Sequence, residues 1–267
     1  MNIQSHKFSS LMLLLFLLGF TVMQVSGVRA AEQVADKVAK EQEVNFTAED
    51  SFLLSGRYYS GAKNGAGVLL LHDCKHDSKS YQALSERLAA SGIHALAMDF
   101  RGYGKSVSEE FSRQKIKTKT RNIVDYQNEI SILMSYWSND VLSAYHFLRS
   151  KVNRDKEVSV VASGCSAVQA VSLAEKMRVN SFVMISPQMN YVEKERFKNL
   201  FDIPAYFINS AQDLETHKIS LELFNWNGDK RSKFQIFKGS RSAYSLLHHD
   251  DYLADDINYW ISANFNN

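Results

Sequence analysis

Short, wholly apolar runs alternate with helical patterns along most of this chain. The runs Val68–Leu71 and 94–100 (HALAMDF) are typical of strands buried on both faces. Between them, residues 80–92 carry apolar side chains at helical spacing and end at Gly92. Further strands are predicted at 157–162, 179–186, 204–211 and 232–239, and an amphipathic helix at 251–265. The alternation predicts an α/β fold with a mostly parallel central sheet and helices on both faces.

The first thirty residues differ from the rest of the chain. An uncharged apolar run follows Lys7, and Val28-Arg29-Ala30 places small residues three and one positions before Ala31. This pattern predicts a signal peptide over residues 1–30. The alternative is a retained anchor, but the run is shorter than the roughly 20 residues of a spanning helix. We therefore expect an exported protein, periplasmic or secreted if bacterial, with no stable membrane span after cleavage.

The rest of the chain is predicted to contain a polar leader at 31–43 and one domain at 44–267, which is large enough for a sizeable core. Within the domain, an insertion at about 107–137 stands where a short connection is usual. It combines a basic stretch with an apolar one. It is either a lid or partner surface, or a solvated loop with a helix packed at the edge of the domain.

Charge and composition exclude several classes of function. The formal charge of +2 falls to zero when residues 1–30 are removed, because Lys7 and Arg29 are lost and no acidic residue is. A neutral chain does not indicate nucleic-acid binding. The chain has no P-loop spacing. HDCKHD at 72–77 is the one dense group of metal-ligand residue types. Its first histidine, His72, belongs to the motif LLLHD at 69–73. We therefore predict no cofactor and no metal.

Five segments resemble motifs of the α/β-hydrolase fold family, and the resemblance as a whole covers essentially residues 44–265. The most specific is MDFRGYGKS, which resembles the family's Asp-x-Arg-Gly-x-Gly-x-Ser after a strand. The segment FKGSRSAYSLL resembles the turn that delivers the histidine in the dienelactone-hydrolase-like branch. An intact member would hydrolyse carboxylic esters, but a fold alone does not give activity. The segments are LLLHD at 69–73, MDFRGYGKS at 98–106, VVASGCSAVQAVSLA at 160–174, IPAYFINSAQD at 203–213 and FKGSRSAYSLL at 237–247.

The family's nucleophile lies in a strained turn between a strand and a helix. Three registers place it at Gly164, Cys165 or Ser166. Family helices carry small residues six and ten positions after the nucleophile, and only the register of Gly164 puts alanines, Ala170 and Ala174, at both. Glycine is therefore predicted at the nucleophile position, where it offers no side chain for attack.

The triad positions that remain are only partly matched. The resemblance puts Ser242 where the branch has its histidine. His248 and His249 follow six and seven residues later and are expected to start the last helix, either as surface residues or as a displaced base. Asp213 matches the family's acid, but an acid supports no mechanism without a histidine to orient. The resemblance thus implies a degenerate triad.

The oxyanion-hole loops carry both cysteines. The resemblance assigns one N–H donor to Cys165 and the other to the loop at Asp73 and Cys74, where Asp73 replaces a glycine. A carboxylate there would repel a developing oxyanion. Because these loops are neighbours in the fold and export favours oxidation, a Cys74–Cys165 disulfide is predicted. The alternative is two free, buried thiols.

These positions favour a pseudo-hydrolase, an exported protein with a binding or scaffolding role and an impaired site at Gly164 and Ser242. The alternative is an active carboxylesterase or dienelactone-type hydrolase that uses Cys165 with His248 as the base. A third hypothesis is a partner-binding role centred on 107–137. The residues do not name the ligand or the protein partner.

Overall fold

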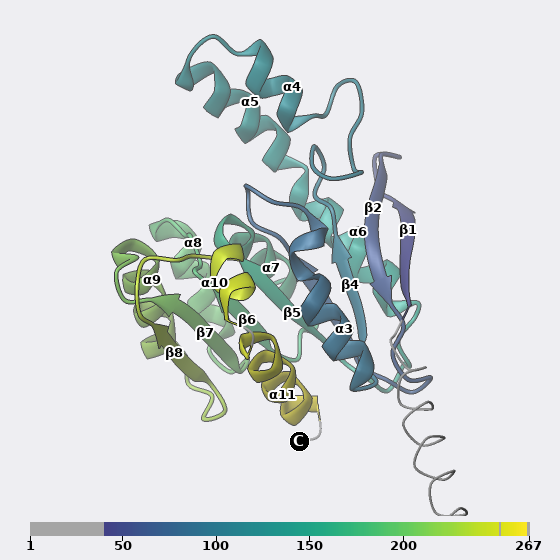
Figure 1. Cartoon of the computed structure of the whole chain (residues 1–267), viewed down its shortest axis with the longest axis vertical. Coiled ribbons are helices and arrows are strands. Elements are labelled where there is room, and N and C mark those ends of the chain that lie inside the picture. Colours follow the sequence, from purple (N-terminus) through teal and green to yellow (C-terminus); the bar gives the residue numbers. More distant parts are fainter. Residues whose placement is uncertain (1–39, 251, 266–267) are drawn as a thin grey trace, which may run out of the picture. The chain divides into compact units, whose positions relative to one another are not determined.

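An eight-stranded sheet forms the centre of the part that the computed structural model describes, residues 40–250 and 252–265 (Figure 1). Its strands are β1 (Glu41–Thr47), β2 (Leu53–Tyr59), β3 (Gly67–Leu71), β4 (His94–Met98), β5 (Val158–Ser163), β6 (Phe182–Ile185), β7 (Ala205–Ser210) and β8 (Lys233–Phe237). Their order is β1-β2-β4-β3-β5-β6-β7-β8. The pairs β1–β2 and β2–β4 are antiparallel, and the other neighbouring strands are parallel. The predicted α/β fold is confirmed, whereas the predicted signal peptide at 1–30 lies outside the described residues.

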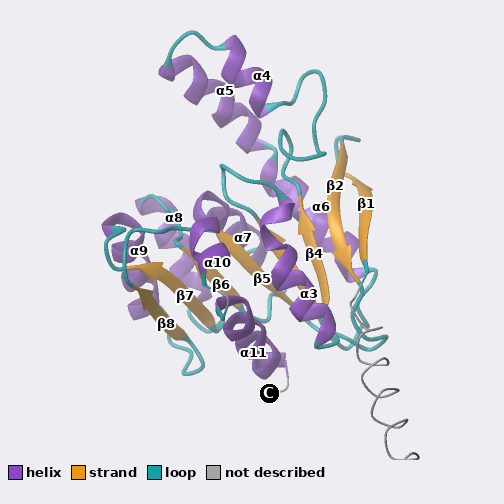
Figure 2. Cartoon of the chain, viewed as in Figure 1, coloured by secondary structure: helices purple, strands orange, loops and turns teal. Residues whose placement is uncertain are grey.

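Helices cover both faces of this sheet (Figure 2). One face packs against α6 (Trp137–Arg149), α7 (Ala167–Ala174), α8 (Tyr191–Phe197) and α9 (Leu214–Trp226). The other packs against α3 (Gln82–Ala90), α10 (Tyr244–His249) and α11 (Leu253–Phe265). Short 3-10 turns stand at η1 (Ser78–Tyr81), η2 (Gly164–Ser166) and η3 (Lys198–Leu200). None of the helices in the described ranges is long and apolar enough to cross a membrane.

Strand β3 shows why the central strands are unbroken apolar runs. Leu69 and Leu71 belong to the apolar cluster on one face of the sheet, and Val68 and Leu70 belong to the cluster on the other. All four side chains are fully buried. Successive side chains of a strand point to opposite faces. A strand covered by helices on both sides therefore needs an apolar residue at every position.

The carboxyl ends of three parallel strands meet at one edge of the sheet. Leu71, the last residue of β3, pairs with Met98 of β4 and with Ala162 of β5. In open α/β sheets, ligands bind beyond the carboxyl ends of the strands. The loops that leave these three strands are therefore the place to look for a functional site.

The N-terminal boundary of the domain differs from the prediction. β1 begins at Glu41, inside the segment 31–43 that was expected to be a leader before a domain at 44–267. Glu41 lies opposite Tyr59, accepts a hydrogen bond from the Tyr59 hydroxyl at 2.6 Å and pairs with Arg57. Polar cross-strand pairs of this kind add to the burial of Phe46 in stabilising β1. They explain why a polar sequence forms an edge strand here.

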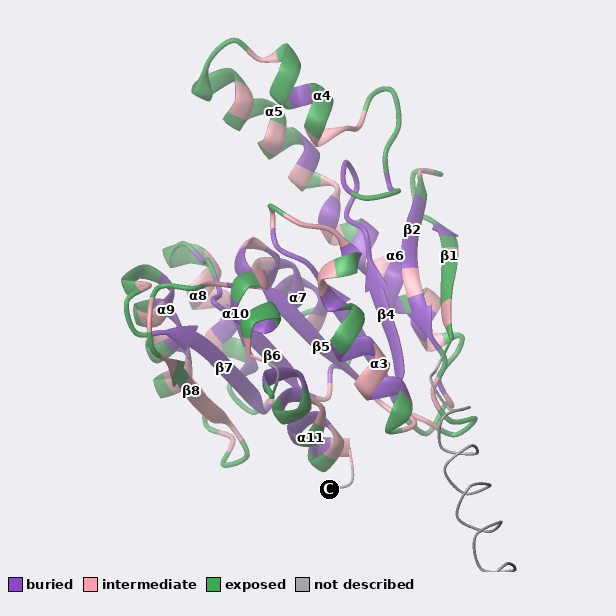
Figure 3. Cartoon of the chain, in the orientation of Figure 1, coloured by how far each residue is buried: buried purple, intermediate pink, exposed green. Residues whose placement is uncertain are grey.

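The predicted insertion at 107–137 contains a pair of helices, α4 (Arg113–Lys119) and α5 (Ile123–Ser135). The pair stands away from the sheet at the top of Figure 1, and Figure 3 shows that most of its surface is exposed. Only Ile116 in α4 and Leu133 in α5 are buried. The insertion is thus attached to the domain at one end and exposed over the rest of its length.

Arg101, from the family-like motif after β4, is a buried charge that holds several segments together. Only 1% of its surface is exposed. Its guanidinium binds Asp140 of α6 at 2.7 and 3.1 Å and Asp50 of the β1–β2 turn at 2.5 and 2.8 Å. Asp140 is fully buried, and burial raises the pKa of its carboxyl group against the opposing effect of Arg101. The arginine is therefore the partner that makes this buried carboxylate tolerable.

Aromatic rings enclose the same guanidinium. The centroids of Phe52, Phe111 and Tyr136 lie 4.3, 4.9 and 4.4 Å from its central carbon. Cation–π contacts of this kind strengthen when they are shielded from water. Phe111 and Tyr136 belong to the two ends of the insertion, so Arg101 also fixes where the insertion leaves the domain.

We expect Arg101→Met to lower the free energy of unfolding by about 3–5 kcal/mol, because it leaves Asp140 charged and buried without a partner. Asp140→Asn should lose less, since the amide carries no charge. Arg231→Met removes a partly exposed ion pair with Asp229 and should cost about 1 kcal/mol or less. Urea unfolding of the three variants tests this order. Equal losses for Arg101→Met and Arg231→Met would contradict it.

Candidate functional site

The turn between β5 and α7 has glycine at its tip. Gly164 has φ of +56°, a left-handed conformation that glycine adopts without a steric penalty. A β-carbon added there would lie 3.1 Å from the β-carbon of Asp73 and 3.9 Å from that of Ala243. Both the backbone conformation and the close approach of Asp73 therefore favour glycine. The chain has the strand–turn–helix shape of a nucleophile elbow, with no side chain at the tip.

Ser166, another register for the nucleophile, has a structural role. It is fully buried. Its hydroxyl accepts the Ser163 N–H at 3.0 Å and lies within hydrogen-bonding distance of the carbonyls of Leu71 (2.8 Å) and Ser163 (2.9 Å). The Ser163 hydroxyl in turn accepts a hydrogen bond from Tyr81 at 2.9 Å. These bonds tie the turn to the end of β3 and keep the Ser166 hydroxyl away from the surface.

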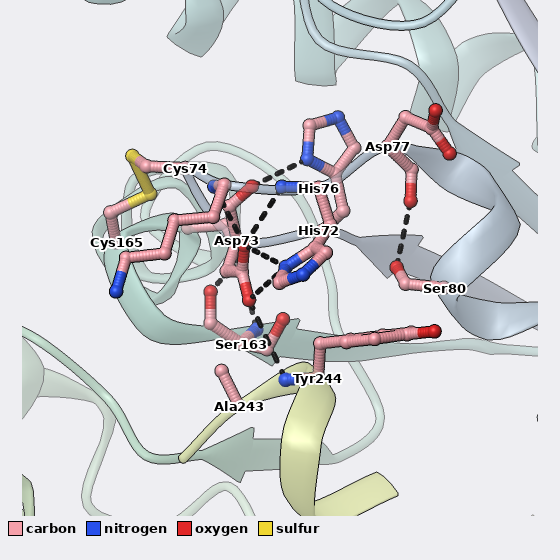
Figure 4. A network of polar contacts seen from close by, with 12 residues as sticks. His72, Asp73, Cys74, His76, Asp77, Ser80, Ser163, Cys165, Ala243 and Tyr244 are labelled. Carbon is pink, nitrogen blue, oxygen red and sulfur yellow. Dashed lines mark hydrogen bonds and ion pairs between the residues drawn. A yellow bond between two sulfur atoms is a disulfide. The ribbon is translucent and has the colours of Figure 1, made fainter. Parts of the chain in front are cut away.

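Asp73 packs over the turn and is 7% exposed. Its Oδ1 atom accepts the backbone N–H groups of Lys75 at 2.7 Å and His76 at 3.1 Å. Nδ1 of the His76 ring lies 2.8 Å from the same oxygen, and the Tyr244 N–H is 3.5 Å from Oδ2 (Figure 4). The carboxylate is thus engaged by its own loop and by one imidazole.

The Asp73–His76 pair was missed in the sequence analysis. The signal was present as an acid and a histidine three residues apart within 72–77, but Asp73 was assigned to the oxyanion-hole loop and His76 only to a group of metal-ligand residue types. No group of three or more metal-ligating side chains in the described ranges is placed to hold an ion.

His72, the motif histidine after β3, is fully buried. Its Nε2 accepts the Phe100 N–H at 3.1 Å, so Nδ1 carries the proton and donates to the Asp73 carbonyl at 2.7 Å. Burial lowers the pKa of His72. Burial also lowers the pKa of His94, whose Nδ1 accepts the Gly61 N–H at 3.1 Å. Both histidines are structural and neutral.

A disulfide joins Cys74 to Cys165, with their Cα atoms 5.9 Å apart. The predicted bridge is confirmed. It links two residues separated by 91 positions in the sequence and ties the loop after β3 to the residue that follows Gly164. The two loops that the resemblance assigns to the oxyanion hole are therefore covalently joined (Figure 4).

A small cavity of about 90 Å³ remains above Gly164. Ligand pockets usually have about 300–1,000 Å³, so this space is small for an ester substrate. The structure brings four of the predicted site residues together here but leaves Asp213 and His248 outside the lining. The lining residues are Asp73, Cys74, Lys75, His76, Gly164, Ser186, Gln188, Ser242, Ala243 and Ser245.

The remaining candidates lie apart from this cavity. Asp213 is half-buried and directly precedes α9. His248 is exposed, and its ring stacks on Tyr244 with centroids 4.7 Å apart. The expectation that His248 and His249 start the last helix is wrong, because they end α10 and α11 begins at Leu253. Burial of the two leucines before them holds α10 as a separate turn of helix.

The hydrolase family described as serine aminopeptidase, S33, matches residues 62–210, more than half of the chain. The chain belongs to this family. The match begins before β3 and ends with β7, so it includes the turn at Gly164 and the Cys74–Cys165 bridge. A comparison with curated proteins gives no match.

Solved structures place this family member within the α/β-hydrolase fold. A dienelactone hydrolase from Anabaena variabilis has a TM-score of 0.63 and 15% identity over 85% of this chain and 98% of its own. An esterase from Pyrococcus furiosus has a TM-score of 0.58 and 16% identity over 86% and 94%. An esterase domain from a Rhodothermus marinus protein has a TM-score of 0.61 and 12% identity over 83% and 97%. The predicted fold family is confirmed.

Replacing Cys74 and Cys165 together with serine should lower the free energy of unfolding by about 2–5 kcal/mol, because a cross-link restricts the unfolded chain. Reductant should destabilise the wild type to a similar extent and leave the double variant unchanged. Urea unfolding with and without dithiothreitol measures both effects. Alkylation of the denatured, unreduced protein should find no free thiol, and two labelled thiols would contradict the bridge.

Acid should destabilise the protein through His72 and His94. A histidine whose folded pKa is lowered gives stability that is present above its unfolded pKa and is lost as pH falls below that value. We expect the free energy of unfolding to fall below about pH 6.5, by up to about 1.4 kcal/mol per pH unit for each histidine. His72→Gln should show a shallower decline in urea unfolding at pH 7.5, 6 and 5. If the free energy of unfolding of His72→Gln falls with pH as steeply as that of the wild type, His72 does not contribute to the acid sensitivity.

Proposed function

We propose that this protein is a non-catalytic member of the hydrolase family that is exported and acts by binding a ligand or partner. The observation that carries the proposal is the elbow. Gly164 provides no nucleophile, and Asp73 packs 3.1 Å from the point where a β-carbon would stand. Loss of a nucleophile alone costs a protease on the order of a millionfold in turnover.

The position of the base supports the same proposal. Ser242 lines the small cavity at Gly164, and its hydroxyl is a poor base at neutral pH. His248 lies outside that lining, exposed and stacked on Tyr244. Asp213 lies outside the same lining, and the histidine in that lining, His76, pairs with Asp73 instead.

The oxyanion site gives a third argument. A hole of this kind needs two N–H groups that converge on the substrate oxygen in a water-excluded space. The Asp73 carboxylate already takes the N–H groups of Lys75 and His76. Its negative charge beside Gly164 would oppose a second anion. The site is therefore poorly suited to a tetrahedral intermediate.

Export is supported by the signal-peptide pattern at 1–30 and by the disulfide. Structural disulfides persist in oxidising compartments and are rare in the cytosol. A periplasmic or secreted location follows if the source is bacterial.

The alternative is an ester hydrolase that uses Cys165 with His248. The thiolate is the attacking species of a cysteine, and the sulfur of Cys165 is bonded to Cys74. This chemistry would need reduction of the bridge and movement of His248 toward the turn. It is the second candidate because the dienelactone-hydrolase-like branch can use cysteine.

We expect the purified mature protein to leave short p-nitrophenyl esters unchanged, with and without dithiothreitol, and to resist labelling by a fluorophosphonate. Gly164→Ser should also stay inactive, because the new side chain meets Asp73 and stands on a left-handed backbone position. Turnover is followed by p-nitrophenolate absorbance, with Cys165→Ala measured alongside. Turnover that requires reductant and vanishes in Cys165→Ala would establish the alternative. Turnover that persists in Cys165→Ala would contradict both functions.

A further inference from the structure

A larger cleft opens beside the closed elbow. It has a volume of about 410 Å³, within the usual range for small-ligand sites. Four segments line it: the loop and turn at 75–80, the turn after β4, the start of α4, and Tyr244 at the start of α10. We call it the outer cleft. Lys75 and His76 line both the outer cleft and the cavity above Gly164, so the two spaces are adjacent.

The outer cleft is positively charged. Lys75, Lys79 and Arg113 line it against a single carboxylate, Asp77. That carboxylate accepts the Lys79 backbone N–H at 2.9 Å and caps η1. The described residues provide no ion-pair partner for Lys75 or Lys79. Three basic side chains therefore face this space with little compensating charge.

Nearby lysines show that such pairing is available on this surface. Lys105 pairs with Glu43, and Lys115 pairs with Glu109 at 2.6 Å. Neither Lys105 nor Lys115 lines the outer cleft. Among the described residues, Lys75, Lys79 and Arg113 thus bring their charges to one concave space without a carboxylate paired to them.

Two walls of the outer cleft are fixed by one buried carboxylate. Asp99, which is 4% exposed, accepts the Ser78 N–H at 2.8 Å and the Lys105 N–H at 2.9 Å. A β-carbon added to Gly104 would lie 2.2 Å from the Asp99 carboxyl carbon, so only glycine allows this approach. The walls are held before any ligand arrives, which reduces the entropy cost of binding.

Aromatic rings form part of the lining. The Arg113 guanidinium lies 5.5 Å from the ring centroid of Tyr103, whose hydroxyl donates to the Cys74 carbonyl at 3.0 Å. The Tyr244 ring packs against that of His76 with centroids 4.2 Å apart, and both are visible in Figure 4. The cleft therefore offers flat apolar surface beside its positive charges.

The geometry points to the outer cleft as a binding site for a small organic phosphate monoester. Lys75, Lys79 and Arg113 would bind the dianion, since lysine serves as a point charge for phosphate. Tyr103 and Tyr244 would contact the ring or apolar body of the ligand. The inference deepens the proposed binding role and rests on it, because the ligand occupies space beside an elbow that does no chemistry.

Phenyl phosphate is the probe, titrated into the mature protein by isothermal calorimetry. Lys75→Gln/Lys79→Gln should weaken its binding by about tenfold or more, because two charge-assisted contacts are lost. The control is Lys63→Gln/Lys230→Gln, which removes the same charge from two exposed lysines on loops before β3 and β8. The control should bind as the wild type does. Added salt should weaken binding to the wild type.

Several results would overturn the inference. Equal weakening of phenyl phosphate binding in both double variants would show that only the net charge of the protein matters. If phenol binds as tightly as phenyl phosphate, the cleft does not recognise the phosphate group. Capture of the protein by phosphatidic-acid vesicles without phenyl phosphate binding would assign the charge to a lipid surface instead.

The p-nitrophenyl acetate assay on the same preparation separates this inference from the proposed function. An inert protein that ignores phenyl phosphate would overturn the cleft and leave the non-catalytic proposal standing. A protein that binds phenyl phosphate at the outer cleft and also turns over the ester would overturn the non-catalytic proposal, while the phosphate site would stand.

Discussion

The close approach of Asp73 to a residue without a β-carbon shapes the whole candidate site. Gly164 holds a left-handed conformation without strain and leaves room for Asp73, whereas a serine or cysteine there would be strained and would press on Asp73. With Asp73 packed there, the loop after β3 lies against the elbow. Cys74 then comes within bridging distance of Cys165. The missing side chain, the packed carboxylate and the disulfide are one arrangement, in which each part depends on the others.

The motifs that resemble hydrolases hold the architecture in this chain. Asp99 ties two loops together, Arg101 neutralises a buried carboxylate, and His72 bonds to backbone groups on both ring nitrogens. These roles need no substrate and no catalytic residue. Family membership therefore predicts the fold of this protein securely and says much less about its reaction.

Most of the open space near the elbow lies beside the turn at Gly164 and not directly above it. The cavity at Gly164 is small, whereas the neighbouring cleft is several times larger and carries the basic side chains. His76 lies at the boundary, with Asp73 bound on one side and the tilted ring of Tyr244 packed on the other. His76 thus belongs both to the cavity at Gly164 and to the wall of the proposed binding site.

The sequence by itself determined the sheet, because strands buried on both faces need apolar residues at every position. The family resemblance of the same sequence predicted the Cys74–Cys165 bridge. The sequence pattern misplaced the start of β1, because the polar residue Glu41 joins the strand through its cross-strand partners. It also misplaced His248, because the separate turn of α10 depends on burial against distant residues. Only the tertiary structure paired Asp73 with His76 and gathered the outer cleft. Those contacts depend on loop conformations, which are set by packing between segments far apart in the chain.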